Sequence, residues 1–90
     1  MKCYIISYDL RNLRNYDSLY KAIKSYGTWA KITESTWGVV TSQSAVQIRT
    51  FLLNHMDNDD RVFVIKSGSE AAWVRAICED SWLKNNLIKS

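Results

Sequence analysis

Hydrophobic residues recur along the first half of the chain with two different periods, and these predict strands and helices in turn. The run from Cys3 to Tyr8 is almost continuously apolar, which is typical of a central β-strand, and it stops at Asp9. Over residues 16–26 apolar side chains return every three or four positions, which predicts an amphipathic helix. Gly27 stands where a helix commonly ends.

The next part of the chain has the pattern of a hairpin followed by a second helix. Residues 28–33 and 36–41 are rich in β-branched and aromatic side chains, and the polar Glu34-Ser35 step between them predicts a tight connection. Ser44 has capping-box spacing to Gln47, which predicts a helix that ends near His55. The polar run 57–60 predicts a turn before a strand over 61–66.

This order of elements, β-α-β-β-α-β, predicts an α+β fold of the ferredoxin-like kind. Four antiparallel strands in the spatial order fourth, first, third, second would carry two helices on one face. The whole chain, 1–90, is expected to be one domain, with a core of 1–67 and a tail of 68–90. The tail is expected to contain a short strand over 71–77, a helix over 79–88, or both. A second subunit's sheet, or this tail crossing onto a partner, would cover the helix-free face.

Composition adds an expectation of self-association. Apolar residues make up 47% of the 90 residues, with four Trp and five Tyr, which is more than a monomer of this size needs, so a homodimer is expected. The formal charge is +3, divided as +4 over residues 1–56 and −1 over residues 57–90. A basic first half is compatible with a phosphate-bearing partner and equally with an ordinary basic surface.

Cysteine, histidine and hydropathy patterns exclude several classes of protein. Cys3 and Cys78 are far apart and accompany a single His, which supports neither a zinc site nor a disulfide framework. No apolar run approaches the ~18 residues of a membrane span, and no export signal is recognisable at the N-terminus. A cytoplasmic protein without a membrane partner is therefore expected.

Four segments within residues 2–66 resemble CRISPR-associated protein two and its relatives, among them the virulence-associated protein D toxins. The segments are Tyr8-Asp9 at the end of the first strand, Tyr26-Gly27 at the end of the helix, the hairpin Glu34-Ser35-Thr36-Trp37, and Asp60-Arg61-Val62-Phe63-Val64-Ile65. The resemblance implies a ferredoxin-like homodimer with facing sheets. The tail beyond Gly68 differs from the integrase-partner members, which points to a stand-alone relative.

The resemblance also implies a site. The family's strand-one carboxylate, the proposed metal ligand for phosphodiester cleavage, corresponds to Asp9, and a divalent ion (Mg or Mn) would be shared by the two copies of this acid. Arg11 and Arg14 would bind flanking phosphates. The family's hairpin serine and aromatic correspond to Ser35 and Trp37, which would belong to the nucleic-acid-binding surface.

Each of these residues also has an ordinary interpretation. Asp9 can cap a turn, Arg11 and Arg14 can form a solvated loop, and Trp37 can pack in the core or a dimer interface. The three acids within 57–60 resemble the ligand residues of a calcium-binding loop. The segment lacks that loop's glycine and terminal glutamate, so a turn is expected. Serine catalysis is rejected because the only His lies on the second helix, away from Ser35.

Three functions follow. The first is a homodimeric protein that acts on RNA or DNA as a metal-dependent endoribonuclease or nuclease, with an integrase or an antitoxin as a protein partner. The second is a noncatalytic scaffold that binds nucleic acid or protein through the same dimer. The third is a ferredoxin-like regulatory module that binds a small ligand.

Overall fold

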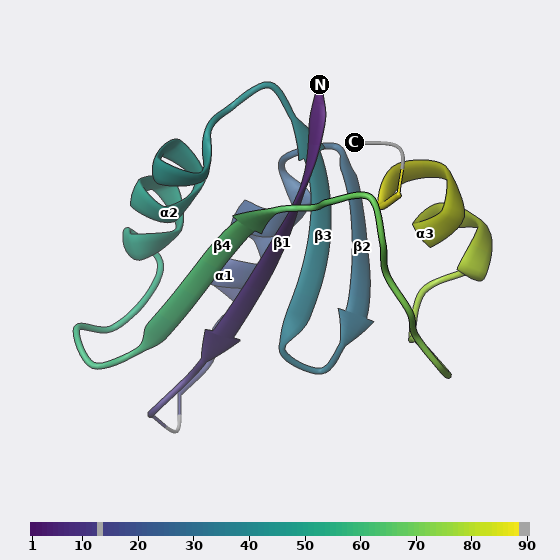
Figure 1. The fold of residues 1–90 in the computed structure, drawn as a ribbon. Coiled ribbons are helices and arrows are strands. Elements are labelled where there is room, and N and C mark those ends of the chain that lie inside the picture. Colours follow the sequence, from purple (N-terminus) through teal and green to yellow (C-terminus); the bar gives the residue numbers. More distant parts are fainter. Residues whose placement is uncertain (13, 89–90) are drawn as a thin grey trace.

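The computed structural model describes residues 1–12 and 14–88, and it shows a four-stranded sheet with three helices (Figure 1). The elements are, in chain order, β1 (Lys2–Asp9), α1 (Asp17–Lys24), β2 (Thr28–Thr33), β3 (Thr36–Thr41), α2 (Ala45–Leu53), β4 (Arg61–Lys66) and α3 (Asp80–Asn86). Every predicted core strand and helix is present, and the three later strands have the predicted bounds.

The sheet is antiparallel throughout, in the order β2-β3-β1-β4. This is the ferredoxin-like order expected from the sequence, with β1 and β3 at the centre. In the register of the sheet, Ser7 of β1 lies between Thr36 of β3 and Phe63 of β4. Asp9 pairs with Arg61, so the end of β1 meets the start of β4 at one rim of the sheet.

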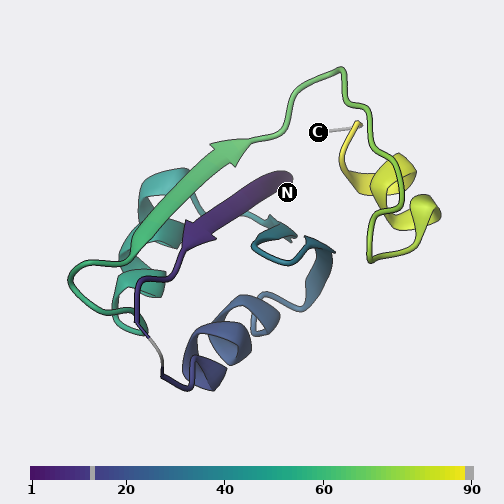
Figure 2. The same ribbon diagram turned by 90° about the horizontal axis from the view of Figure 1, so that it is seen from below.

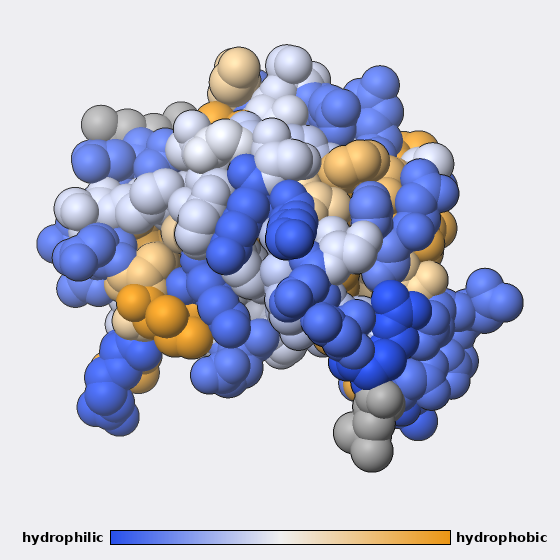
Figure 3. All heavy atoms as spheres, turned by 180° about the vertical axis from the view of Figure 1, so that it is seen from behind, coloured by the Kyte–Doolittle hydropathy of each residue, from blue (hydrophilic) through white to orange (hydrophobic). Residues whose placement is uncertain are grey.

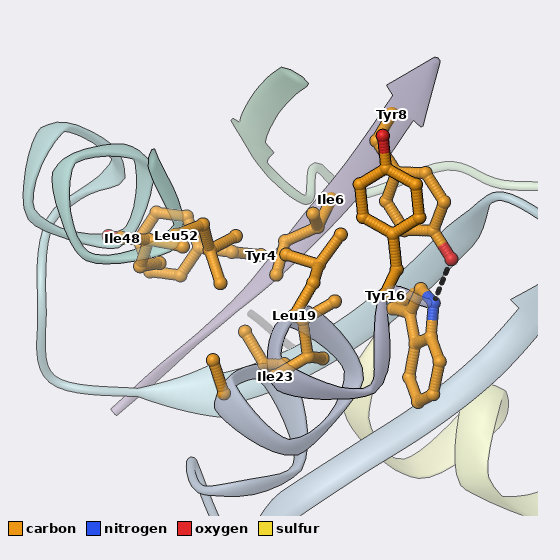
Figure 4. Packing of buried hydrophobic residues seen from close by; sticks show 11 residues of the cluster. Tyr4, Ile6, Tyr8, Tyr16, Leu19, Ile23, Ile48 and Leu52 are labelled. Atoms are coloured by element: carbon orange, nitrogen blue, oxygen red, sulfur yellow. Dashed lines mark hydrogen bonds between the residues drawn. The ribbon is translucent and has the colours of Figure 1, made fainter. Parts of the chain in front are cut away.

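The core lies between the sheet and the first two helices. Alternate residues of β1 point to the same face of the sheet, and Tyr4, Ile6 and Tyr8 are buried there. Leu19 and Ile23 of α1 and Ile48 and Leu52 of α2, all fully buried, pack on them (Figure 4). Fully burying one such side chain contributes about 1.5–3 kcal/mol.

Local chemistry fixes the helix ends. The Ser44 hydroxyl accepts the Gln47 N–H at 3.2 Å while the Gln47 side chain accepts the Ser44 N–H at 2.8 Å, which is the predicted capping box of α2. After α1 the chain turns at Gly27, where φ is +88°. Only glycine adopts that conformation without strain, so the predicted helix stop is confirmed.

The tail folds over the second face of its own sheet, opposite α1 and α2 (Figure 2). The Ser67 N–H donates to the Cys3 carbonyl at 2.9 Å, and the Ile77 N–H donates to the Ile32 carbonyl at 2.9 Å. Leu83 of α3 is fully buried, and the indole of Trp82 lies where a Cβ on Gly38 would point. Part of the helix-free face is therefore covered by the chain's own tail, and the contribution expected from a second subunit stays a prediction.

Residues 71–77 are the one clear disagreement in secondary structure. They form neither strand nor helix, whereas the predicted terminal helix exists as α3. Trp73, Val74 and Ile77 belong to residue types that favour strands, which is why this stretch resembles one in sequence. The strand is interrupted at Arg75, whose φ of +54° lies outside the extended region, and the Ile77–Ile32 backbone bond connects the end of this stretch to β2.

The outer surface is mostly polar on the side that carries α1 and α2, with hydrophobic residues towards its two flanks (Figure 3). On the opposite side the tail covers the β2–β3 half of the sheet. Phe63 and Ile65 of β4 remain 62% and 50% exposed there. Within residues 1–12 and 14–88 no helix has the length and hydrophobicity that crossing a membrane requires.

Candidate functional site

The candidate site is the rim of the sheet where β1 ends and β4 begins. The Asp9 carboxylate lies 2.7 Å from Nη1 of Arg61 and 3.5 Å from Nη1 of Arg11. All three side chains are about half exposed or more, at 53%, 67% and 46%. A rigid central strand therefore presents one acid between two guanidinium groups to solvent.

A shallow hollow adjoins these groups. It has a volume of about 170 Å³ and is lined by Ser7, Tyr8, Asp9, Arg61, Val62 and Phe63. Small-molecule pockets usually measure about 300–1,000 Å³, so this space suits a group such as a phosphate better than a whole metabolite.

Ion pairs at this degree of exposure are weak, on the order of 0–1 kcal/mol. Arg61 and Arg11 can therefore exchange the Asp9 carboxylate for another anion at small cost. A guanidinium offers a planar fork of N–H donors that matches two oxygens of a phosphate. Asp9, Arg11 and Arg61 together carry a net charge of +1, while the adjoining turn holds Asp57, Asp59 and Asp60 with Arg14.

The loop after β1 is held against the turn before β4, chiefly by Asp60. Its carboxylate accepts the Arg11 N–H at 2.8 Å, the Asp57 N–H at 2.8 Å and the Tyr16 hydroxyl at 3.0 Å. Burial raises the pKa of Asp60, but these hydrogen bonds and the charge of Arg14 lower it by more, to below its usual 3.8. Asp60 thus fixes the backbone from which Arg11 projects.

Arg14 is placed differently from Arg11. Its guanidinium pairs with the Asp57 carboxylate and lies 4.8 Å from the centre of the Tyr16 ring. The ion pair with Asp57 holds the same turn in place, so Arg14 supports the rim. Arg14 would have to leave Asp57 before its guanidinium could bind a phosphate.

Residues 57–60 form the turn expected from the sequence. The carboxylates of Asp57, Asp59 and Asp60 gather there, and one oxygen of each lies within 4.8 Å of the others. Such a group has the oxygen ligands that a hard cation prefers. Here N–H and O–H donors occupy those oxygens, because the Asn12 amide donates to Asp57 at 2.9 Å and to Asp59 at 2.8 Å, beside the bonds of Arg14 and Tyr16. Hydrogen bonds and an ion pair from the protein's own side chains therefore stabilise the three carboxylates of this cluster.

The two hairpin residues of the predicted site, Ser35 and Trp37, lie in different environments. Ser35 is exposed, and its carbonyl accepts the Tyr8 N–H at 3.1 Å, which places the hairpin turn beside the end of β1. Trp37 is only 3% exposed, and its indole N–H donates to the Tyr8 hydroxyl at 2.9 Å. The structure thus brings Ser35 to the rim next to Asp9 and puts Trp37 in the core.

The residues around Asp9 do not by themselves fit a divalent ion. One protomer offers a single carboxylate there, and its nearest charged neighbours are the cations Arg61 and Arg11. Mg²⁺ is usually held by one or two carboxylates, with waters and substrate phosphates as its other ligands, and a carboxylate paired with two arginines is a poor single ligand. A second Asp9 from a partner copy would supply a second carboxylate.

Arg61 is the site residue that the sequence analysis did not single out. It was assigned only to the start of a strand, although the predicted pairing of the first and fourth strands already implies that it lies opposite Asp9. The predicted strand order could therefore have identified Arg61, because antiparallel pairing brings the end of one strand to the start of its neighbour.

Comparison of the chain with models of protein families and with curated proteins found no match in either.

Proposed function

We propose that this protein binds the phosphate backbone of a nucleic acid at the β1–β4 rim. The observation that carries the proposal is the exposed Asp9 carboxylate, held between Arg61 and Arg11 beside a phosphate-sized hollow. A phosphodiester would take the place of the carboxylate on the two guanidiniums.

The proposed active form is a homodimer that cleaves RNA. The resemblance to CRISPR-associated protein two and to virulence-associated protein D supports this step, since in that family the matching acid is the proposed metal ligand and a dimer contains two copies of it. Two copies of Asp9 would hold Mg²⁺ or Mn²⁺, which would polarise the phosphate and activate water. In that arrangement Arg11 and Arg61 position the phosphate, and Asp60 keeps the loop of Arg11 in place.

Binding is tested by fluorescence anisotropy with labelled RNA and DNA over a range of salt concentrations. Arg61→Gln should weaken binding and lower the slope of log affinity against log salt by about one unit. Arg49→Gln, which removes an exposed arginine of α2, is the matched control and should leave both values unchanged. Equal effects of the two variants would remove the rim from the proposal.

Cleavage is tested with the same substrates in the presence of magnesium or manganese. Product should form with the wild type and not with Asp9→Asn, which keeps the size of the side chain and removes its charge. Cleavage that persists in Asp9→Asn would exclude this acid from the chemistry.

A second candidate is a noncatalytic scaffold that presents the same rim to nucleic acid or to a protein partner such as an integrase or an antitoxin. The observation that favours it is the pairing of Asp9 with two arginines, which suits anion binding without a metal. Salt-sensitive binding without any product, with or without metal, would support this candidate over the nuclease.

A further inference from the structure

A second hollow lies at the opposite edge of the sheet, along the outer strand β2. It has a volume of about 310 Å³ and is lined by Trp29, Ala30, Lys31, Ile77, Cys78, Glu79 and Trp82. Its walls come from β2 on one side and from the tail on the other. Trp29 is 37% exposed and Ile77 is 56% exposed, so solvent reaches the aromatic and apolar parts of the lining.

The lining fits an uncharged flat ring. Two indoles, an isoleucine and an alanine are among the lining residues, and the one lysine and the one glutamate have opposite charges. Because β2 is an edge strand, alternate backbone N–H and C=O groups along Trp29–Lys31 face this side. Such groups can pair with the polar edge of a nucleobase, and the exposed part of the Trp29 indole can contact its ring.

Cations lie around this hollow where the phosphates of a bound strand would run. The Lys24 ammonium lies 5.1 Å from the centre of the Trp29 ring. The Lys31 ammonium lies 5.8 Å from the centre of the Trp37 ring and 3.5 Å from the Glu34 carboxylate, an exposed ion pair that a phosphate can replace. Lys24 is exposed and can move from the indole to a phosphate when a base takes its place on the ring.

The hollow and the β1–β4 rim can be reached by one nucleic-acid strand. Ser35 of the hairpin is hydrogen-bonded to Tyr8, next to Asp9, and Lys31 precedes the same hairpin on β2. From strand spacings of about 4.8 Å and rises of about 3.3 Å per residue, the Cα atoms of Asp9 and Lys31 lie about 14 Å apart, with Lys31 facing the helix side of the sheet and Asp9 the other side. That distance corresponds to about four nucleotides at a stacked spacing of 3.4 Å.

From these observations we infer that the β2-edge hollow binds an unpaired base of a single strand whose phosphates are held at the rim. The inference rests on the proposed function and adds that the preferred ligand is single-stranded. Base pairing would hide the ring edge that the backbone groups of β2 contact, so a duplex would lose this contact.

The first test compares a short single-stranded oligonucleotide with an abasic oligomer of the same length. Both carry the phosphates that the rim binds, and only the first carries bases. The wild type should bind the intact oligomer about 5- to 150-fold more tightly, which is the range expected for one stacked base. Equal affinity would overturn the inference and leave rim binding intact, whereas binding of neither oligomer would overturn both proposals.

Variants then assign the difference to the hollow. Trp29→Ala should abolish the preference for the intact oligomer without changing the affinity for the abasic one. Phe51→Ala removes an aromatic side chain of nearly equal exposure, 36%, from α2 and should keep the preference. Arg61→Gln should weaken binding of both oligomers alike, which separates the rim from the hollow.

The reactivity of Cys78 reports on occupancy of the hollow in the wild-type protein. It lines the hollow and is half-buried, whereas Cys3 is 1% exposed, so a maleimide should modify Cys78 first. Burial, together with the nearby Asp80 and Glu79, raises the pKa of the Cys78 thiol, so the reaction is run at mildly alkaline pH. The intact oligomer should slow modification of Cys78, measured by mass spectrometry, and the abasic oligomer should not. Equal rates with both oligomers would contradict the inference.

Discussion

Tyr8 and Trp37 support the rim from inside the core. Tyr8 is 8% exposed and accepts the indole N–H of Trp37, and its own hydroxyl donates to the Glu34 carbonyl at 3.4 Å. Burial is the main cause that raises the pKa of Tyr8, so this hydroxyl stays neutral around neutral pH. The pair connects the residue before Asp9 with the hairpin.

Tyr8→Phe should lower the free energy of unfolding by about 1–3 kcal/mol, because it leaves the buried indole N–H without its acceptor. Urea unfolding monitored by circular dichroism measures the change. Tyr4→Phe removes a hydroxyl from the same face of β1 without touching this bond, and it should cost less. Equal losses in the two variants would show that the Trp37 bond contributes nothing specific.

Asp60 should make stability depend on pH in the acidic range. Its folded pKa lies below the ordinary value of 3.8, so its contribution is present above that pH and is lost as pH falls through the folded pKa. The wild type should therefore exceed Asp60→Asn in stability at neutral pH, and the difference should shrink below about pH 4. Urea unfolding at a series of pH values checks this, and a difference independent of pH would contradict it.

Among single residues, the sequence placed Asp9 at the end of the first strand, and the family resemblance assigned Ser35 and Trp37 to the binding surface, but neither could decide which face of the sheet Trp37 occupies. An aromatic residue in a β-branched strand can face either the helices or the open side, and the two choices differ by one position in register. The packing of Tyr20, whose ring stacks on Trp37 with centres 6.2 Å apart, turns this side chain to the helix side. A role for Trp37 in nucleic-acid binding stays a prediction.

At the scale of elements, the hydrophobic periodicity predicted the core strands and helices. Each of these elements buries one of its faces, and this leaves a regular pattern of apolar residues in its own sequence. The tail could not be predicted in the same way. Its position depends on contacts between residues far apart in sequence, above all between α3 and Gly38. That contact exists because Gly38 has no side chain, so the sheet surface can receive the Trp82 ring.

Gly38→Ala should therefore loosen α3. An added Cβ would lie 2.9 Å from two atoms of the Trp82 ring, so the indole or the whole helix must shift. We expect a lower melting temperature and a changed tryptophan emission spectrum. Gly68→Ala is the control, since a Cβ there meets nothing within 4 Å, and a similar loss in both variants would argue against the α3 contact.

At the scale of the whole molecule, the tail divides the helix-free face in two. The half over β2 and β3 is covered by α3, and the half over β1 and β4 keeps Phe63 and Ile65 exposed beside Ile5. A cavity of about 310 Å³ runs between this apolar strip and the tail, lined in part by Ile5, Ile65 and Leu83. A proposed dimer that brings two Asp9 carboxylates together would use the strip, because Asp9 lies at its end.

Ile65→Lys should convert the proposed dimer to a monomer, because a lysine at the centre of an apolar contact would be buried without a partner. Leu53→Lys is the matched control: Leu53 is 47% exposed on α2, against 50% for Ile65, and α2 packs on the other face of the sheet. Analytical ultracentrifugation measures the mass of each variant, and circular dichroism checks that each is folded. If Ile65→Lys remains a dimer, the subunits meet elsewhere. The two Asp9 carboxylates then have no reason to share an ion, and only the anion-binding role of the rim survives.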